Sequence, residues 1–147
     1  KATLAYNGMP FTVPKNLYMI GMMNTADRSL AVIDYALRRR FSFFEIEPGF
    51  HSAGFQSYQS ALDQDTFNIL IERIKELNQE IAADSSLGPG FRIGHSYFCG
   101  QAECTDEWLK EVVEYDILPM LHEYWFDEPD KLQRWENILR GVFNDER

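Results

Sequence analysis

The sequence predicts an α/β chain in which strand and helix alternate near the amino terminus and helices fill the remainder. An apolar run of strand length, residues 17–23, precedes a short amphipathic segment, and a second apolar segment follows at residues 41–46. Beyond Pro48 and Gly49 the apolar residues recur at helical spacing instead. This shift divides the chain into two predicted parts, residues 1–48 and 49–147.

The amino-terminal part reads as one strand–helix–strand unit. Residues 17–23 are continuously apolar, as expected for a strand that is covered on both faces. Leu30, Ile33 and Leu37 recur at i, i+3 and i+7, which places one apolar stripe on a helix that begins near Arg28. Strand, helix and strand at this spacing predict a parallel crossover unit.

The second part predicts three helices after a connector at residues 49–65, which is rich in Gly, Ser and Gln. Asp65 can cap the first helix, and the Gly- and Pro-containing stretch 84–90 ends it. Thr105 caps the second helix, which Pro119 should kink or end. A last helix is expected from Asp130 to about Arg140. The predicted core residues are Leu70, Ile74, Leu77 and Ile81, then Trp108, Val112 and Ile117, then Leu132, Trp135 and Leu139.

Composition limits the classes of function. The net charge of −9 disfavours nonspecific attraction to DNA or to anionic membranes. No apolar run is long enough to span a membrane and no signal peptide opens the chain, so we expect a cytoplasmic protein. The start at Lys1, without a methionine, suggests a piece of a longer polypeptide. Cys99 and Cys104 match no familiar zinc pattern, and we expect reduced cysteines and no metal site.

Asn24 is the first candidate for chemistry. It stands at the carboxyl end of the first predicted strand, where parallel sheets bind their ligands. A neutral amide can orient an attacking water or bond a terminal phosphate oxygen without adding negative charge. The alternative is local: Asn24 makes a turn and Asp27 caps the next helix.

Three consecutive arginines, Arg38, Arg39 and Arg40, form the second candidate. At about 100° per residue they fan around the end of the predicted helix. An exposed guanidinium there can stabilise charge on the γ-phosphate of a neighbouring subunit, an effect worth about 10³ to 10⁵ in rate. The alternative, interaction with the helix carboxyl end, is worth only about 0.3 to 1 kcal/mol. Three consecutive arginines are more than the interaction with the helix carboxyl end requires.

These segments resemble the second half of an AAA+ nucleotide-hydrolysing module. Residues 19–29 (Met-Ile-Gly-Met-Met-Asn-Thr-Ala-Asp-Arg-Ser) and 34–44 (Asp-Tyr-Ala-Leu-Arg-Arg-Arg-Phe-Ser-Phe-Phe) resemble the GTPase subunit of methylcytosine-specific restriction systems, the McrB family. Residues 90–97 resemble the helical lid of that family. The resemblance implies the carboxy-terminal strands of an AAA+ P-loop NTPase core over residues 1–48 and an α-helical lid over 49–147. A phosphate loop of the form G-x-x-x-x-G-K-[ST] does not occur in the sequence.

The resemblance also implies roles for the candidates in the amino-terminal part. Asn24 corresponds to the sensor 1 residue and acts on the γ-phosphate. Arg39 is the first choice for the arginine finger and Arg40 the second, whereas Arg38 is the structural one. Asp27 belongs to an Asn-Thr-Ala-Asp segment that has been likened to the guanine-recognition sequence of small GTPases. We favour a helix cap or a partner's cation for Asp27 over guanine contact.

In the lid, Arg92 and His95 are the candidates for nucleotide binding. By resemblance, either could approach the phosphates as sensor 2 residues do. The alternative for Arg92 is an ordinary ion pair or a solvated side chain. His51 and His122 have no partner pattern and are expected to be structural.

The implied function is that of a fragment of a ring-forming AAA+ GTPase, a hexamer by resemblance. The intact protein would hydrolyse GTP with Mg²⁺ and power DNA translocation for a restriction endonuclease directed at 5-methylcytosine. A separate nuclease subunit would cut the DNA, and an amino-terminal domain outside this chain would bind it. Without a phosphate loop, the fragment alone is expected neither to bind nucleotide tightly nor to hydrolyse it.

Two alternatives stay open from the sequence. An AAA+ ATPase of the MoxR-like or dynein-related branch would share the architecture, use ATP and remodel proteins. A non-catalytic defence adaptor module would keep the fold without hydrolysis, although such a module would not need Asn24 or Arg39.

Overall fold

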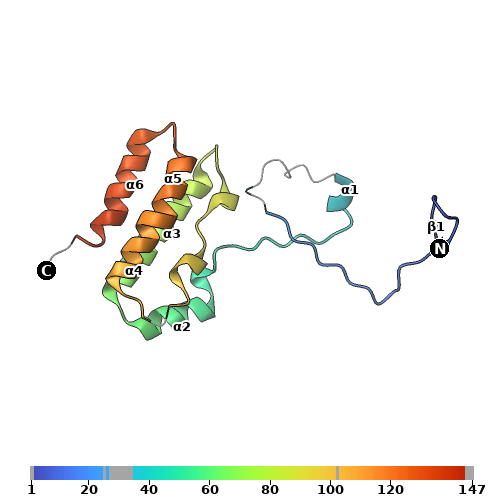
Figure 1. The fold of residues 1–147 in the computed structure, drawn as a ribbon, viewed down its shortest axis with the longest axis horizontal. Coiled ribbons are helices and arrows are strands. Elements are labelled where there is room, and N and C mark those ends of the chain that lie inside the picture. Colours follow the sequence, from blue (N-terminus) through green and yellow to red (C-terminus); the bar gives the residue numbers. More distant parts are fainter. Residues whose placement is uncertain (1, 25, 27–34, 102, 145–147) are drawn as a thin grey trace.

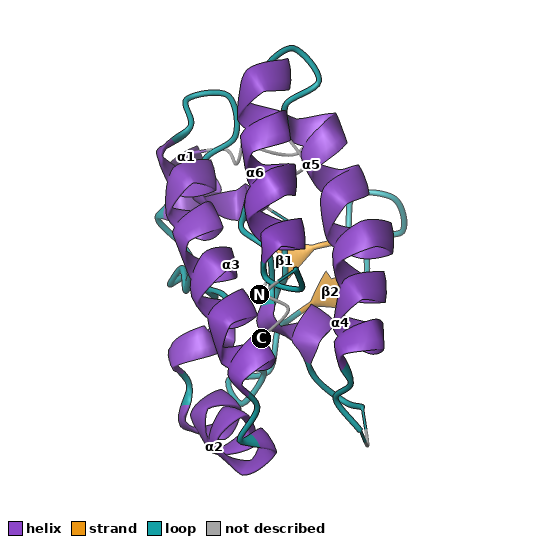
Figure 2. Ribbon diagram, turned by 90° about the vertical axis from the view of Figure 1, so that its left-hand side faces the viewer, coloured by secondary structure: helices purple, strands orange, loops and turns teal. Residues whose placement is uncertain are grey.

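The computed structural model describes residues 2–24, 26, 35–101 and 103–144. Its helices from residue 49 onward pack into one body, which we call the helical bundle, and the described residues before 49 form an arm that extends away from it (Figure 1). Helices α3, α5 and α6 run alongside one another, and α2 closes one end of the bundle (Figure 2). The part of the chain that is described contains no helix both long enough and apolar enough to cross a membrane.

The first half of the bundle is made of α2 (Ala53–Leu62) and α3 (Asp65–Ala83), which follow a 3₁₀ turn at Gly49–His51. The hydroxyl of Ser52 caps α2 by accepting a hydrogen bond from the Phe55 amide at 3.2 Å. Asp63 ends α2 in the left-handed region, with φ 46°. The predicted connector at residues 49–65 is therefore wrong. Phe55 is buried in the core, so packing overrides the low helix propensity of its Gly- and Ser-rich surroundings.

The second half consists of α4 (Asp106–Glu111), a π-helical segment (Val112–Ile117), α5 (Leu118–Tyr124) and α6 (Pro129–Gly141). Thr105 caps α4 as predicted, with its hydroxyl accepting from the Trp108 amide at 3.2 Å. The helix continues past Pro119 instead of ending there. Proline lacks an amide hydrogen and crowds the carbonyl one turn before it, and the π-helical segment immediately ahead relieves that conflict.

The core lies on α3. Its predicted residues Leu70, Ile74, Leu77 and Ile81 are fully buried. Two indole groups reach carboxylates at the carboxyl end of the same helix: Trp135 donates to Glu80 at 3.1 Å and Trp125 donates to Asp84 at 3.0 Å. Arg134 also pairs with Glu80, and Lys131 pairs with Asp84 at 2.6 Å. The predicted Val112, Ile117, Trp135 and Leu139 are buried as well, whereas Trp108 and Leu132 are half-buried beside them.

The arm does not form the predicted strands. Residues 17–23 and 41–46 are irregular and unpaired, and the described strands are β1 (Ala2–Thr3) and β2 (Pro10–Phe11), an antiparallel pair in which Ala2 faces Phe11. The strand prediction is therefore wrong for this structure. A strand hydrogen-bonds to neighbouring strands rather than to itself, and the described residues offer no such neighbour here. Of the predicted helix only α1 (Tyr35–Arg38) is described.

Candidate functional site

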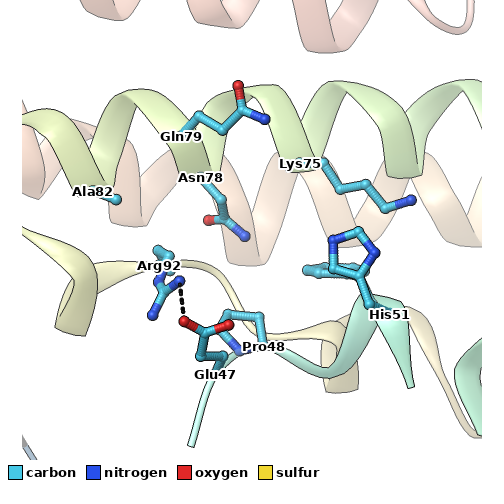
Figure 3. A pocket seen from close by; sticks show the side chains of 9 residues that line it. Glu47, Pro48, His51, Lys75, Asn78, Gln79, Ala82 and Arg92 are labelled. Carbon is cyan, nitrogen blue, oxygen red and sulfur yellow. Dashed lines mark hydrogen bonds and ion pairs between the residues drawn. The ribbon is translucent and has the colours of Figure 1, made fainter. Parts of the chain in front are cut away.

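A hollow of about 190 Å³ lies where the arm joins the bundle (Figure 3). Glu47 and Pro48 line it from the arm, Lys75 and Asn78 from α3, and Arg92 from the loop of residues 89–98 that follows α3. Two cationic side chains and one buried amide therefore surround the same small space.

Arg92 is held between the bundle and the arm. Its Nε donates to the carbonyl of Pro89 at 2.9 Å. Its two terminal nitrogens pair with Glu47 at 3.4 Å and with Glu45 at 3.6 Å, and Figure 3 shows the guanidinium directed at Glu47. The side chain is only 18% exposed, so the loop positions this cation rather than leaving it to solvent.

Asn78 fixes that loop to α3. Its side-chain amide donates to the Ile93 carbonyl at 2.8 Å, and its oxygen accepts from the Ile93 amide at 2.6 Å. Asn78 is the buried polar residue of the described core, and Ile93 is 1% exposed. Sequence reasoning missed Asn78, although a polar residue directly after Leu77 on the apolar face of a helix is a usable signal.

His95 faces the junction with the arm. Its Nδ1 accepts a hydrogen bond from the Gly49 amide at 2.9 Å. The ring meets Phe50 and Phe55 edge-on, with centroids 6.1 Å and 5.9 Å away. His95 and Arg92 thus lie on one loop, as their spacing predicts, and both contact residues 45–49.

The predicted catalytic residues lie on the arm. Asn24 is exposed, and its side-chain oxygen accepts from the Ala26 amide at 3.1 Å, which is the local turn that we named as the alternative. Arg38 places its guanidinium 5.6 Å from the centre of the Phe43 ring, a cation–π contact. Arg39 and Arg40 are exposed. Asp27 lies outside the described residues.

The described residues do not by themselves make a complete nucleotide–metal site. Ligand pockets usually measure about 300 to 1,000 Å³, so the hollow has room for a phosphate group or part of a nucleotide rather than for GTP. Within the described ranges no three or more His, Cys, Asp or Glu side chains are grouped to hold a metal ion. GTP with Mg²⁺ therefore does not fit the described residues alone.

The two cysteines lie beside the loop as free thiols. Cys99 donates to the carbonyl of His95 at 3.3 Å. Burial raises the pKa of both the Cys99 and the Cys104 thiol, which favours the protonated, unreactive form.

Comparison with known proteins identifies relatives of this chain. Residues 69–133 match the family described as "McrB, alpha-helical lid domain". The chain is also 53% identical over 138 residues to the "Type IV methyl-directed restriction enzyme EcoKMcrB subunit" of Escherichia coli (strain K12). That alignment covers 89% of this chain and 30% of the relative, so the chain spans less than a third of the relative's length.

Proposed function

Because this chain belongs to the McrB family, as a carboxy-terminal part that includes the helical lid, we propose that it functions within a ring-forming AAA+ GTPase. The ring, a hexamer, would power DNA translocation for a modification-dependent restriction endonuclease. Support comes from the relative's description as a methyl-directed restriction enzyme subunit and from the match to the lid family. The recognised modification would be 5-methylcytosine, bound by an amino-terminal domain, and a separate nuclease subunit would cut the DNA.

The observation that carries the proposal is a difference in burial. The helices of the lid bury their apolar side chains, whereas the arm exposes its own. Ile20 and Met22 are both 94% exposed, and Phe44 and Ile46 are 95% and 88% exposed. Fully burying such side chains is worth about 1.5 to 3 kcal/mol each. Apolar runs of strand length with exposed side chains are what the last strands of a sheet present when the other strands are supplied by the rest of a longer protein.

Three arm residues would act on the nucleotide in the completed core. Asn24 would leave its local turn and face the γ-phosphate as sensor 1. Arg39, or failing it Arg40, would reach the nucleotide of the neighbouring subunit as the arginine finger. Asp27 would cap the helix or meet a cation of that neighbour. If the completed core binds GTP with Mg²⁺, Asn24 and the arginine are the side chains that would stabilise negative charge on the phosphoryl group, whereas the Asp27 carboxylate would not.

The lid would supply the remaining contacts. Arg92 can exchange the carboxylates of Glu45 and Glu47 for a phosphate, since a guanidinium binds both groups with the same two-pronged geometry. The Nδ1 of His95 already accepts from the Gly49 amide, so we assign the lid contact to Arg92 and keep the Nε2 edge of His95 as the alternative. The isolated chain, which lacks a phosphate loop, would neither bind GTP tightly nor turn it over.

The test is made in the full-length protein with Arg39→Ala. We expect kcat for GTP to fall by about 10³-fold or more while nucleotide affinity stays within a few-fold, because a finger acts in the transition state. Arg38→Ala is the matched control and should retain most of the activity. Unchanged turnover in Arg39→Ala, with the same result for Arg40→Ala, would refute the finger assignment.

A mixing experiment tests whether the finger acts across subunits. Asn24→Ala subunits lack their own sensor and Arg39→Ala subunits lack the finger. A mixed ring contains some interfaces in which both groups are intact, so the mixture should hydrolyse GTP faster than either variant alone. Repeating the assay with ATP separates the GTPase from the MoxR-like or dynein-related ATPase, which would prefer adenine.

A further inference from the structure

The turn at Gly49–His51 connects the arm to the bundle, and His95 holds its first residue. The Gly49 amide donates to His95 Nδ1 at 2.9 Å across 46 positions of sequence. Phe50, the next residue, is 3% exposed and packs its ring edge-on against Phe55 at 5.3 Å. The base of the arm is therefore anchored on both sides of one peptide bond.

The His95 ring packs closely against Gly49 and two aromatic side chains. A Cβ atom built on Gly49 would lie 2.8 Å from His95 Cε1, closer than carbon atoms pack. Phe50 and Phe55 meet other parts of the ring. Position 49 thus requires glycine because of the imidazole and not because of its backbone angles.

The loop that carries His95 is fixed in turn to the central helix. Asn78 makes both hydrogen bonds to Ile93, two residues before His95. Ile93 itself is buried. Asn78 thereby links α3 to the loop, and the hydrogen bond from Gly49 to His95 links the loop to the base of the arm.

A second tie sets the direction of the arm beyond the turn. Arg92 pairs with Glu45 and Glu47, which alternate with the exposed Phe44 and Ile46. In extended chain, alternate residues point to opposite sides. Residues 44–47 therefore turn an acidic edge to the lid and an apolar edge away from it, and the arginines at 38–40 lie a few residues further along the same segment.

We propose that His95 is a positioning residue that, through the Gly49 amide, sets the direction in which residues 41–47 leave the lid. Asn78 completes the connection, which we call the hinge latch (Asn78, His95 and Gly49). Its consequence for hydrolysis rests on the proposed function: a change in lid position would move the arginines at 38–40, so that the lid of one subunit adjusts the finger offered to its neighbour.

The first test uses the 147-residue chain and the exchange of the Gly49 amide hydrogen, followed by NMR. His95→Phe keeps an aromatic ring against Phe50 and Phe55 but removes the acceptor. We expect exchange at Gly49 to accelerate by about tenfold, while the Ile93 amide, held by Asn78, stays protected and reports an intact lid. His51→Phe, in the same turn but on an exposed side chain, should leave Gly49 unchanged. An equally slow Gly49 amide in His95→Phe would overturn the proposal.

A double-mutant cycle tests the contact between Gly49 and His95 by changing Gly49 as well. Gly49→Ala should disturb the junction in the presence of His95, because the new methyl group meets the ring. In the His95→Ala background the same change should have a much smaller effect on the amide shifts of residues 44–50, since the ring is gone. Additive effects in the two backgrounds would show that the residues do not act together.

The consequence for hydrolysis is tested in the full-length protein. His95→Phe should lower kcat several-fold and leave KM for GTP nearly unchanged, because a positioning residue that touches no nucleotide alters only the assembled site. A raised KM with unchanged kcat would instead assign His95 to nucleotide binding and overturn the positioning role. If the full-length protein hydrolyses no nucleotide, the proposed function fails, whereas the Gly49 exchange result still decides the latch.

Discussion

The bundle and the arm both contain many apolar side chains, but these are buried in the bundle and exposed on the arm. Every buried apolar residue in the described part of the chain lies between Phe50 and Leu139. The arm leaves Tyr18, Ile20, Met22 and Phe44 almost fully exposed. Helices satisfy their backbone hydrogen bonds internally and need only an apolar face to pack. Strands need neighbours first, so the helices of this chain form while residues 17–23 and 41–46 stay irregular.

The bundle also encloses a charged group, the carboxylate of Asp84, and surrounds it with partners. Asp84 is 6% exposed at the side chain and is met by Lys131, the indole of Trp125 and the Ser86 amide. Lys131 in addition lies 4.6 Å from the centre of the Trp125 ring. Buried charges tolerate such positions only when they are paired and hydrogen-bonded, so this cluster is a second place where the bundle can be broken.

The largest effect should come from truncating the core of α3. Leu77 is fully buried, and Leu77→Ala should lower the free energy of unfolding by about 2 to 5 kcal/mol, because it removes packing and leaves a cavity. Ile69→Ala on the same helix, where the side chain is 42% exposed, should cost far less. Thermal or urea unfolding followed by tryptophan fluorescence measures both. Equal losses would mean that α3 is not the centre of the core.

The next effect concerns the Asp84 cluster. Asp84→Asn removes the carboxylate that Lys131 meets at 2.6 Å and leaves it only Glu128, at 3.4 Å. Because the pair is partly buried, we expect a loss of roughly 1 to 3 kcal/mol, between that of a surface pair and that of a fully buried one. Glu72→Gln is the control, because Glu72 pairs with Lys75 while 63% exposed and such surface pairs contribute about 0 to 1 kcal/mol. A loss in Asp84→Asn no larger than in Glu72→Gln would contradict this account.

The same cluster predicts how the bundle responds to acid. The hydrogen bond from Lys131 holds the pKa of Asp84 well below its usual range, with help from Trp125 and Ser86 and against the effect of burial. Since the folded-state pKa is depressed, the stabilisation is present above the unfolded-state value of about 3.9 and is lost as the pH falls below it. Unfolding curves between pH 7 and pH 2 should therefore show a steeper acid loss in the wild type than in Asp84→Asn.

Much of the bundle follows from the sequence, because helical periodicity and capping are local. Leu70 to Ile81 and the Thr105 cap could be read directly. Helix α2 could not, since its formation depends on Phe55 reaching a core that is built by distant residues. The contacts of Asn78 and His95 also join residues far apart in the sequence. The strands at 17–23 and 41–46 were predicted from apolar content. Apolar content indicates that a strand would be buried in a sheet, but the described residues do not contain the neighbouring strands with which it would pair.

The smallest expected effect is at Ile20, on the arm. Ile20→Ala removes a side chain that is 94% exposed, and the free energy of unfolding of the 147-residue chain should change by less than about 0.5 kcal/mol. In the full-length protein, where we propose that residues 17–23 pair with other strands, the same change should cost about 2 to 5 kcal/mol. Leu77→Ala is the control, because the lid is complete in both lengths and its cost should not change. An Ile20→Ala effect that stays small in the longer protein would show that the arm is not part of a buried sheet. A large effect only in the longer protein would show that the exposed apolar residues of the arm are buried by strands outside this chain.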